Sequence, residues 1–130
     1  MSWKILVVED DDDSRDLLVM LLDLHGFNIV TGVDGREGLI VAEAEHPDLI
    51  ITDLQMPHLD GIEMIRLLRQ HSLLSTIPIL VLTACGNVET ANAVMAGADQ
   101  AMTKPIEFKP LMSCIEDLLG SGESLKHSHC

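Results

Sequence analysis

Aromatic residues are almost missing from this 130-residue sequence, which has two phenylalanines, one tryptophan and no tyrosine. Hydrophobic residues still make up 47% of the chain, enough for a buried core and unlike a disordered composition. The core must therefore be built from Leu, Ile, Val, Ala and Met. A chain of 130 residues suits one compact domain, and no internal repeat or second domain is visible.

Basic residues are also scarce, because 8 Lys and Arg stand against 21 Asp and Glu, for a net charge of −13. Such a surface repels the phosphates of nucleic acids, so direct DNA or RNA binding is not expected. It also argues against docking on anionic membranes. An acidic surface does suit cations and basic protein partners.

Cysteines and long apolar runs are few. Cys85, Cys114 and Cys130 form no CxxC pair and do not resemble a disulfide framework, which favours a reducing, cytoplasmic compartment. No stretch approaches the ~20 apolar residues of a membrane span. The apolar run after Trp3-Lys4 is too short for the core of a signal peptide.

Five short apolar segments alternate along the chain with segments of helical periodicity. The predicted strands are residues 5–8, 27–31, 49–52, 79–83 and 100–103. The first predicted helix begins at an N-cap on Asp13 or Ser14 and ends before Gly26. The other predicted helices are residues 34–45, 61–70, 87–96 and 107–119.

This alternation predicts an α/β fold, a doubly wound five-stranded parallel sheet with helices on both faces. Right-handed crossovers leave few topologies, and we favour strand order 2-1-3-4-5, the flavodoxin-like (βα)5 arrangement. The predicted domain is residues 1–120, followed by a flexible polar tail over residues 121–130.

Carboxylates follow two strands that this order makes neighbours. Glu9, Asp10 and Asp11 follow the first strand and Asp53 follows the third, at the point where strand order reverses and ligands bind in such sheets. Carboxylates this close repel one another, and a divalent cation relieves the repulsion. Oxygen ligands in an open site favour Mg²⁺. Asp12 and Asp13 are interpreted as helix-capping residues.

The fourth and fifth predicted strands end in groups that suit a phosphoryl group. Thr83-Ala84 supplies a hydroxyl and Lys104 a cation at the same edge of the sheet, and both would offset the charge of a phosphoryl group on Asp53. Alone, Thr83 is better interpreted as an ordinary strand-end threonine, and Lys104 is equally well a surface lysine before a turn. Pro105 makes the Lys104–Pro105 bond a candidate for a cis peptide.

With these residues in place, the sequence resembles the receiver domains of bacterial two-component response regulators. The resemblance covers about residues 3–119. The matching segments share both order and spacing, and they are residues 5–11 (ILVVEDD), 48–57 (DLIITDLQMP), 60–61 (DG), 78–84 (PILVLTA), 97–98 (GA) and 103–105 (TKP).

The resemblance implies a phosphorelay role. Asp53 would be the nucleophile, modified by phosphoryl transfer from the phosphohistidine of a histidine kinase or phosphotransfer protein. Asp10 would ligate Mg²⁺ directly, Glu9 would do so through water, and Asp53 and the backbone carbonyl of Gln55 would complete the protein ligands. The chain would catalyse only its own phosphorylation and dephosphorylation, so it would not otherwise be an enzyme.

The phosphoryl group would be bound by Thr83 and Lys104, with Ala84 small enough to leave it room. After transfer, Thr83 would move toward the new oxygens and bias the packing of the fourth helix and fifth strand. An output protein would then recognise the changed surface.

The sequence departs from the family in two places. Ala101 stands where many members carry an aromatic switch residue, so Met102 and its neighbours would substitute or signalling would use another face. The last predicted helix lacks the basic residues with which family transcription factors dimerise, so we expect a monomer or a weak dimer. The chain shows no output domain, which fits a stand-alone or an excised receiver, and Met1 slightly favours the former.

Other interpretations stay open at this point. A receiver-like module could dock its partners without phosphorylation, and Ala101 favours that alternative. A haloacid dehalogenase-type hydrolase needs a second Asp where this chain has Gln55, and a flavin carrier needs a glycine- and hydroxyl-rich loop where it has acids. Cys85 is either a tuning residue or a loop thiol. His127, His129 and Cys130 are either metal ligands or parts of a flexible tail.

Overall fold

The computed structural model describes residues 3–54, 56, 59–84 and 87–120. Strands and helices alternate strictly along these residues. Their bounds are β1 (Lys4–Val8), α1 (Asp12–Leu24), β2 (Asn28–Gly32), α2 (Gly35–Glu45), β3 (Leu49–Thr52), α3 (Gly61–Gln70), β4 (Ile79–Thr83), α4 (Asn87–Ala96), β5 (Gln100–Thr103) and α5 (Phe108–Gly120). The strands form one parallel sheet in the order β2-β1-β3-β4-β5. The predicted doubly wound, flavodoxin-like (βα)5 fold is therefore confirmed.

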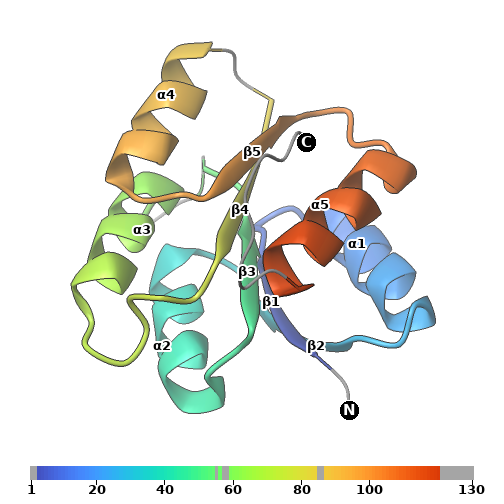
Figure 1. The fold of residues 1–130 in the computed structure, drawn as a ribbon, viewed down its shortest axis with the longest axis horizontal. Helices are drawn as coiled ribbons and strands as arrows, with labels where there is room; N and C mark the ends of the chain where they lie inside the picture. Colours follow the sequence, from blue (N-terminus) through green and yellow to red (C-terminus); the bar gives the residue numbers. More distant parts are fainter. Residues whose placement is uncertain (1–2, 55, 57–58, 85–86, 121–130) are drawn as a thin grey trace.

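The helices cover the sheet in two layers, with α1 and α5 on one face and α2, α3 and α4 on the other (Figure 1). Successive residues of a strand point to opposite faces, so Leu6 and Val8 pack toward α2–α4 while Ile5 and Val7 pack toward α1 and α5. Because both faces are covered, β1, β3 and β4 are continuous apolar runs rather than alternating ones.

Register brings the ends of the strands together at one edge of the sheet, called here the carboxyl edge. Val8 pairs with Thr52, so the next residues, Glu9 and Asp53, leave the sheet side by side. Thr83 pairs with Thr103, which places the loops after β4 and β5 next to each other. The opposite edge, where the strands begin, is called the amino edge.

The start of α1 differs from the prediction. Its N-cap is Asp11, whose carboxylate accepts a hydrogen bond from the Ser14 N–H at 2.9 Å, so the prediction of Asp13 or Ser14 is wrong. That hydrogen bond lowers the pKa of Asp11. Asp12 and Asp13 lie in the first turn, where their negative charges interact favourably with the helix dipole, but neither residue is the N-cap.

Six other boundaries are shifted by one residue: β1 begins at Lys4, β2 ends at Gly32, α5 ends at Gly120, and three further elements begin one residue later than predicted. β2 begins at Asn28, α2 begins at Gly35 with Asp34 as its N-cap, and α5 begins at Phe108. Pro110 lies in the first turn of α5, where a missing N–H costs no hydrogen bond.

The cysteines depart from expectation in one respect. Cys114 is buried in α5 and is disulfide-bonded. The predicted tail over residues 121–130 also lies outside them. No helix in the described part of the chain combines the length and apolarity needed to cross a bilayer.

Candidate functional site

Three predicted carboxylates from two loops meet at the carboxyl edge. Glu9, Asp10 and Asp53 each offer one oxygen, and these oxygens lie within 4.8 Å of one another. Glu9 is buried, Asp53 is half-buried and Asp10 is exposed, so the cluster opens to solvent on the Asp10 side. A site made only of carboxylate oxygens, open on one side, fits a hard divalent cation such as Mg²⁺.

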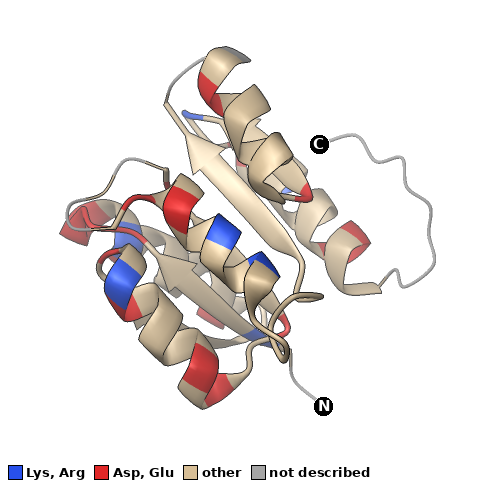
Figure 2. Ribbon diagram, turned by 90° about the vertical axis from the view of Figure 1, so that its left-hand side faces the viewer, with Lys and Arg blue, Asp and Glu red and all other residues tan. Residues whose placement is uncertain are grey.

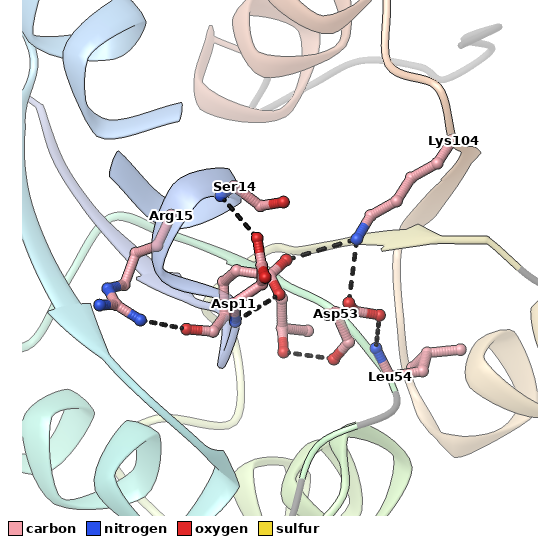
Figure 3. A network of polar contacts seen from close by, with 8 residues as sticks. Asp11, Ser14, Arg15, Asp53, Leu54 and Lys104 are labelled. Carbon is pink, nitrogen blue, oxygen red and sulfur yellow. Dashed lines mark hydrogen bonds and ion pairs between the residues drawn. The ribbon is translucent and has the colours of Figure 1, made fainter. Parts of the chain in front are cut away.

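Lys104 reaches this cluster from the loop after β5. Its Nζ lies 3.0 Å from Oδ2 of Asp53 and 3.4 Å from Oε1 of Glu9, and Figure 3 shows its side chain reaching toward Asp53. The peptide bond between Lys104 and Pro105 is cis, as the sequence suggested. One ammonium group faces three carboxylates, so the cluster keeps excess negative charge that a divalent cation would offset.

The environment shifts the pKa of both the buried Glu9 and the half-buried Lys104. Burial raises the pKa of Glu9, and the Asp53 charge adds to this, against hydrogen bonds from the Asp11 N–H and Lys104 that lower it. Burial lowers the pKa of Lys104, but the hydrogen bond and charge of Asp53, together with Glu9, outweigh it, so that pKa is raised. Lys104 is therefore cationic at neutral pH.

The backbone around Asp53 holds its carboxylate in place. Oδ1 accepts a hydrogen bond from the Leu54 N–H at 2.6 Å (Figure 3), and the Thr52 hydroxyl donates to the Asp53 carbonyl at 2.7 Å. The first residue of α3, Gly61, lies directly against this segment and donates its N–H to the Leu54 carbonyl at 2.8 Å. A Cβ at Gly61 would collide with the carbonyl of Asp53, so only glycine lets α3 begin here.

Thr83 and Ala84 follow the prediction in position. Thr83 is the buried last residue of β4, its carbonyl accepts the Lys104 N–H at 2.8 Å, and Ala84 is exposed beyond it. Two predicted site residues, Gln55 and Cys85, lie outside the described residues, so the ligand role of Gln55 stays a prediction. The same holds for His127, His129 and Cys130.

One residue at this edge was missed by the sequence analysis. Arg15 in α1 hydrogen-bonds the Glu9 carbonyl and the Asp12 carboxylate. The only signal for it in the sequence is the spacing of three between Asp12 and Arg15, which places both side chains on one face of a helix.

Comparison with known proteins identifies the family to which the chain belongs. The family model described as the response regulator receiver domain matches residues 5–116. The chain belongs to this family, whose members interact with histidine kinases and output domains.

Relatives and solved structures give the same assignment. The alkaline phosphatase synthesis transcriptional regulatory protein PhoP of Bacillus subtilis is 40% identical over 124 residues, covering 95% of this chain and 51% of that protein. This chain thus spans about half the length of the curated relatives it matches. Chemotaxis protein CheY4 of Vibrio cholerae has a TM-score of 0.86 at 29% identity, covering 92% of this chain and all of that one.

A third similar protein was solved with a metal. It is the receiver domain of a sensor histidine kinase from Pseudomonas aeruginosa, with a magnesium ion coordinated in its active-site cleft. Its TM-score is 0.87 at 27% identity, covering 93% of this chain and 100% of that one.

Proposed function

We propose that this domain accepts a phosphoryl group on Asp53 from the phosphohistidine of a histidine kinase or phosphotransfer protein. The observation that carries the proposal is the position of the Asp53 carboxylate, which lies inside a three-carboxylate cluster and within hydrogen-bond distance of Lys104. In the transfer, the bond from phosphorus to the imidazole nitrogen breaks and a bond to a carboxylate oxygen of Asp53 forms. The nitrogen keeps the electron pair of the broken bond.

Phosphoryl transfer depends mainly on positioning and on offsetting negative charge. Lys104, already bonded to Asp53, would bind a phosphoryl oxygen, and Thr83 would donate its hydroxyl to another after a small movement. Ala84 would leave room for the group. The chain would carry out only its own phosphorylation and dephosphorylation.

Mg²⁺ fits the oxygen donors and the excess negative charge of the cluster. Glu9, Asp10 and Asp53 would hold it, together with the backbone carbonyl of Gln55. Bound there, it would supply the positive charge that brings an anionic phosphoryl donor close to an anionic carboxylate.

The domain would then pass a change of shape to an output protein. We propose that residues 1–120 form the receiver domain and residues 121–130 a tail, which the end of α5 at Gly120 supports. The protein would act in the cytoplasm as a monomer or weak dimer and would not itself bind nucleic acid. Acidic side chains are spread over several helices (Figure 2), which favours basic protein partners over phosphates.

The test is to incubate the chain with acetyl phosphate and Mg²⁺ and to map the added phosphoryl mass by peptide mass spectrometry. We expect a single label on Asp53, no label in Asp53→Ala and a weak label in Asp10→Ala. The control is Asp117→Ala, which removes an exposed carboxylate from α5 and should be labelled like the unchanged chain. A label on another residue, or one independent of Mg²⁺, would contradict the proposal.

The phosphorylation-independent docking module is the second candidate, favoured by Ala101. This small, half-buried residue of β5 packs against the core beneath α4, where no aromatic ring is available to move. Beryllofluoride, a phosphoryl mimic, separates the two candidates. Mg²⁺-dependent beryllofluoride binding supports the phosphoacceptor, and no binding supports the docking module.

A further inference from the structure

Arg15 clamps the loop that carries the acidic cluster. Its Nη1 donates a hydrogen bond to the backbone carbonyl of Glu9 at 2.9 Å, and its Nη2 donates to Oδ1 of Asp12 at 2.5 Å. The two bonds hold both ends of the segment from Glu9 to Asp12. Asp10 lies inside that segment, so the guanidinium of Arg15 fixes the backbone from which two carboxylates of the cluster project.

Helix stability does not explain this arrangement. A cation near the first turn of a helix faces the positive end of the helix dipole, so this position is unfavourable for α1 itself. The Arg15 side chain is nevertheless only 15% exposed, while its partner Asp12 is 82% exposed. An ordinary pair at the same spacing exists in α3, where Arg66 and Glu63 are 56% and 48% exposed. The Arg15 side chain is therefore less exposed than either member of that surface ion pair, and it also bonds the Glu9 carbonyl.

The loop needs such a contact because it consists of consecutive acids. Residues 9–13 are Glu-Asp-Asp-Asp-Asp, and their mutual repulsion favours an extended, spread-out segment. Lys104 and Arg15 approach from opposite sides of Asp11 and Asp53 (Figure 3). Lys104 bonds the carboxylates of Glu9 and Asp53 themselves. Among the described residues, Arg15 bonds the Glu9 backbone and Asp12 and none of the three clustered carboxylates, so it acts on where those carboxylates lie.

We propose that Arg15 is a positioning residue for the divalent cation, holding the loop from Glu9 to Asp12 so that Glu9 and Asp10 already lie beside Asp53 before the ion binds. This inference rests on the proposed metal site. Groups that orient metal ligands without touching the metal change affinity by about 10- to 100-fold.

The test measures Mg²⁺ binding to the metal-free chain by calorimetry, apart from any phosphorylation. Arg15→Ala should raise the Kd for Mg²⁺ about tenfold. Arg66→Ala, the matched control, removes an arginine at the same spacing from an acid and should leave Kd unchanged. Hydrogen exchange in the metal-free protein should be faster in Arg15→Ala at the amides of residues 10–12 and unchanged in the control.

Arg15→Lys separates position from charge, because lysine keeps the charge but lacks the planar fork that reaches both partners. A Kd that stays weakened in Arg15→Lys supports the inference, and a Kd restored to that of the unchanged chain overturns it. Should Arg15→Ala fail to fold by circular dichroism, Arg15→Lys alone decides in the same way. If the unchanged chain binds Mg²⁺ and both variants bind it equally well, this inference fails while the proposed function stands. No Mg²⁺ binding by the unchanged chain would overturn the metal site and this inference together.

Discussion

The two edges of the sheet differ in how their acidic and basic side chains are paired. At the amino edge, Arg69 pairs with Asp99 at 2.8 Å and Lys4 pairs with Glu45 at 2.8 Å, one cation for one anion. At the carboxyl edge, three carboxylates cluster, and the ammonium of Lys104 pairs with two of them, Glu9 and Asp53. The same strands run through both edges, so the difference comes from the loops and not from the sheet.

This difference separates a structural site from the proposed phosphoacceptor site. The Arg69 guanidinium satisfies three backbone acceptors in two connections, the carbonyls of Ser75 and Ile77 between α3 and β4 and that of Gly97 between α4 and β5. The Asp99 carboxylate in turn accepts the Ile79 N–H at the start of β4. The carboxyl edge is left with excess like charge, which lowers stability and is retained where a ligand requires it.

The largest expected effect on stability comes from removing the Arg69 side chain at the amino edge. Arg69→Ala leaves Asp99 without its cation and three backbone carbonyls without a donor, so we expect the free energy of unfolding to fall by about 3 kcal/mol. Urea unfolding followed by circular dichroism measures it. The control Arg66→Ala removes an exposed pair and should cost less than about 0.5 kcal/mol. Equal losses in the two variants would show that the Arg69 contacts are no stronger than a surface ion pair.

At the carboxyl edge, removal of a charge should have the opposite sign. Asp10→Asn relieves repulsion with Glu9 and Asp53, so in a chelator the free energy of unfolding should rise by about 1 kcal/mol. Added Mg²⁺ should stabilise the unchanged chain and stabilise Asp10→Asn less, because ligand binding favours the folded state. Thermal unfolding with and without Mg²⁺ checks both, with Asp117→Asn as the exposed control. A loss of stability in chelator would mean that Asp10 has a structural role.

Much of the carboxyl edge could be predicted from the sequence because its strands and its polar side chains are recognisable from their residue types. Buried strands are apolar runs, and the acids, Thr83 and Lys104 interrupt those runs at the strand ends. Parallel strands bring their carboxyl ends to one edge, so the topology alone placed Asp53 beside Glu9. The roles of these residues in phosphoryl transfer stay predictions, as does that of Gln55.

The two arginines that bond backbone carbonyls could not be predicted in this way. Arg15 and Arg69 bond backbone carbonyls, and every residue has a carbonyl, so no residue type marks the partner. The N-cap of α1 was missed for a related reason. Four consecutive aspartates, residues 10–13, can each cap a helix, and the choice of Asp11 depends on where β1 ends and how the loop turns.

A smaller effect should appear as a dependence on pH. Burial raises the pKa of Glu9 in the folded protein above its ordinary value of 4.5. Between that value and the raised one, the folded state binds more protons than the unfolded state, so the free energy of unfolding falls as pH rises. In chelator, Glu9→Gln should remove this fall, as urea unfolding at a series of pH values would show. Parallel curves for the two proteins would mean that Glu9 titrates normally.

The smallest effect should come from the exposed pair at the amino edge. Glu45→Gln breaks the ion pair with Lys4. The side chain of Lys4 is 35% exposed and that of Glu45 is 42% exposed. The loss in free energy of unfolding should therefore stay below about 0.5 kcal/mol and vanish in high salt. Urea unfolding at low and high salt measures it. Arg69 and Lys4 each pair with one anion. If Glu45→Gln costs little stability and Arg69→Ala costs much, then burial and the bonded carbonyls stabilise the amino edge, and the pairing of charges does not. A loss as large as that of Arg69→Ala would instead make charge matching itself the difference between the two edges.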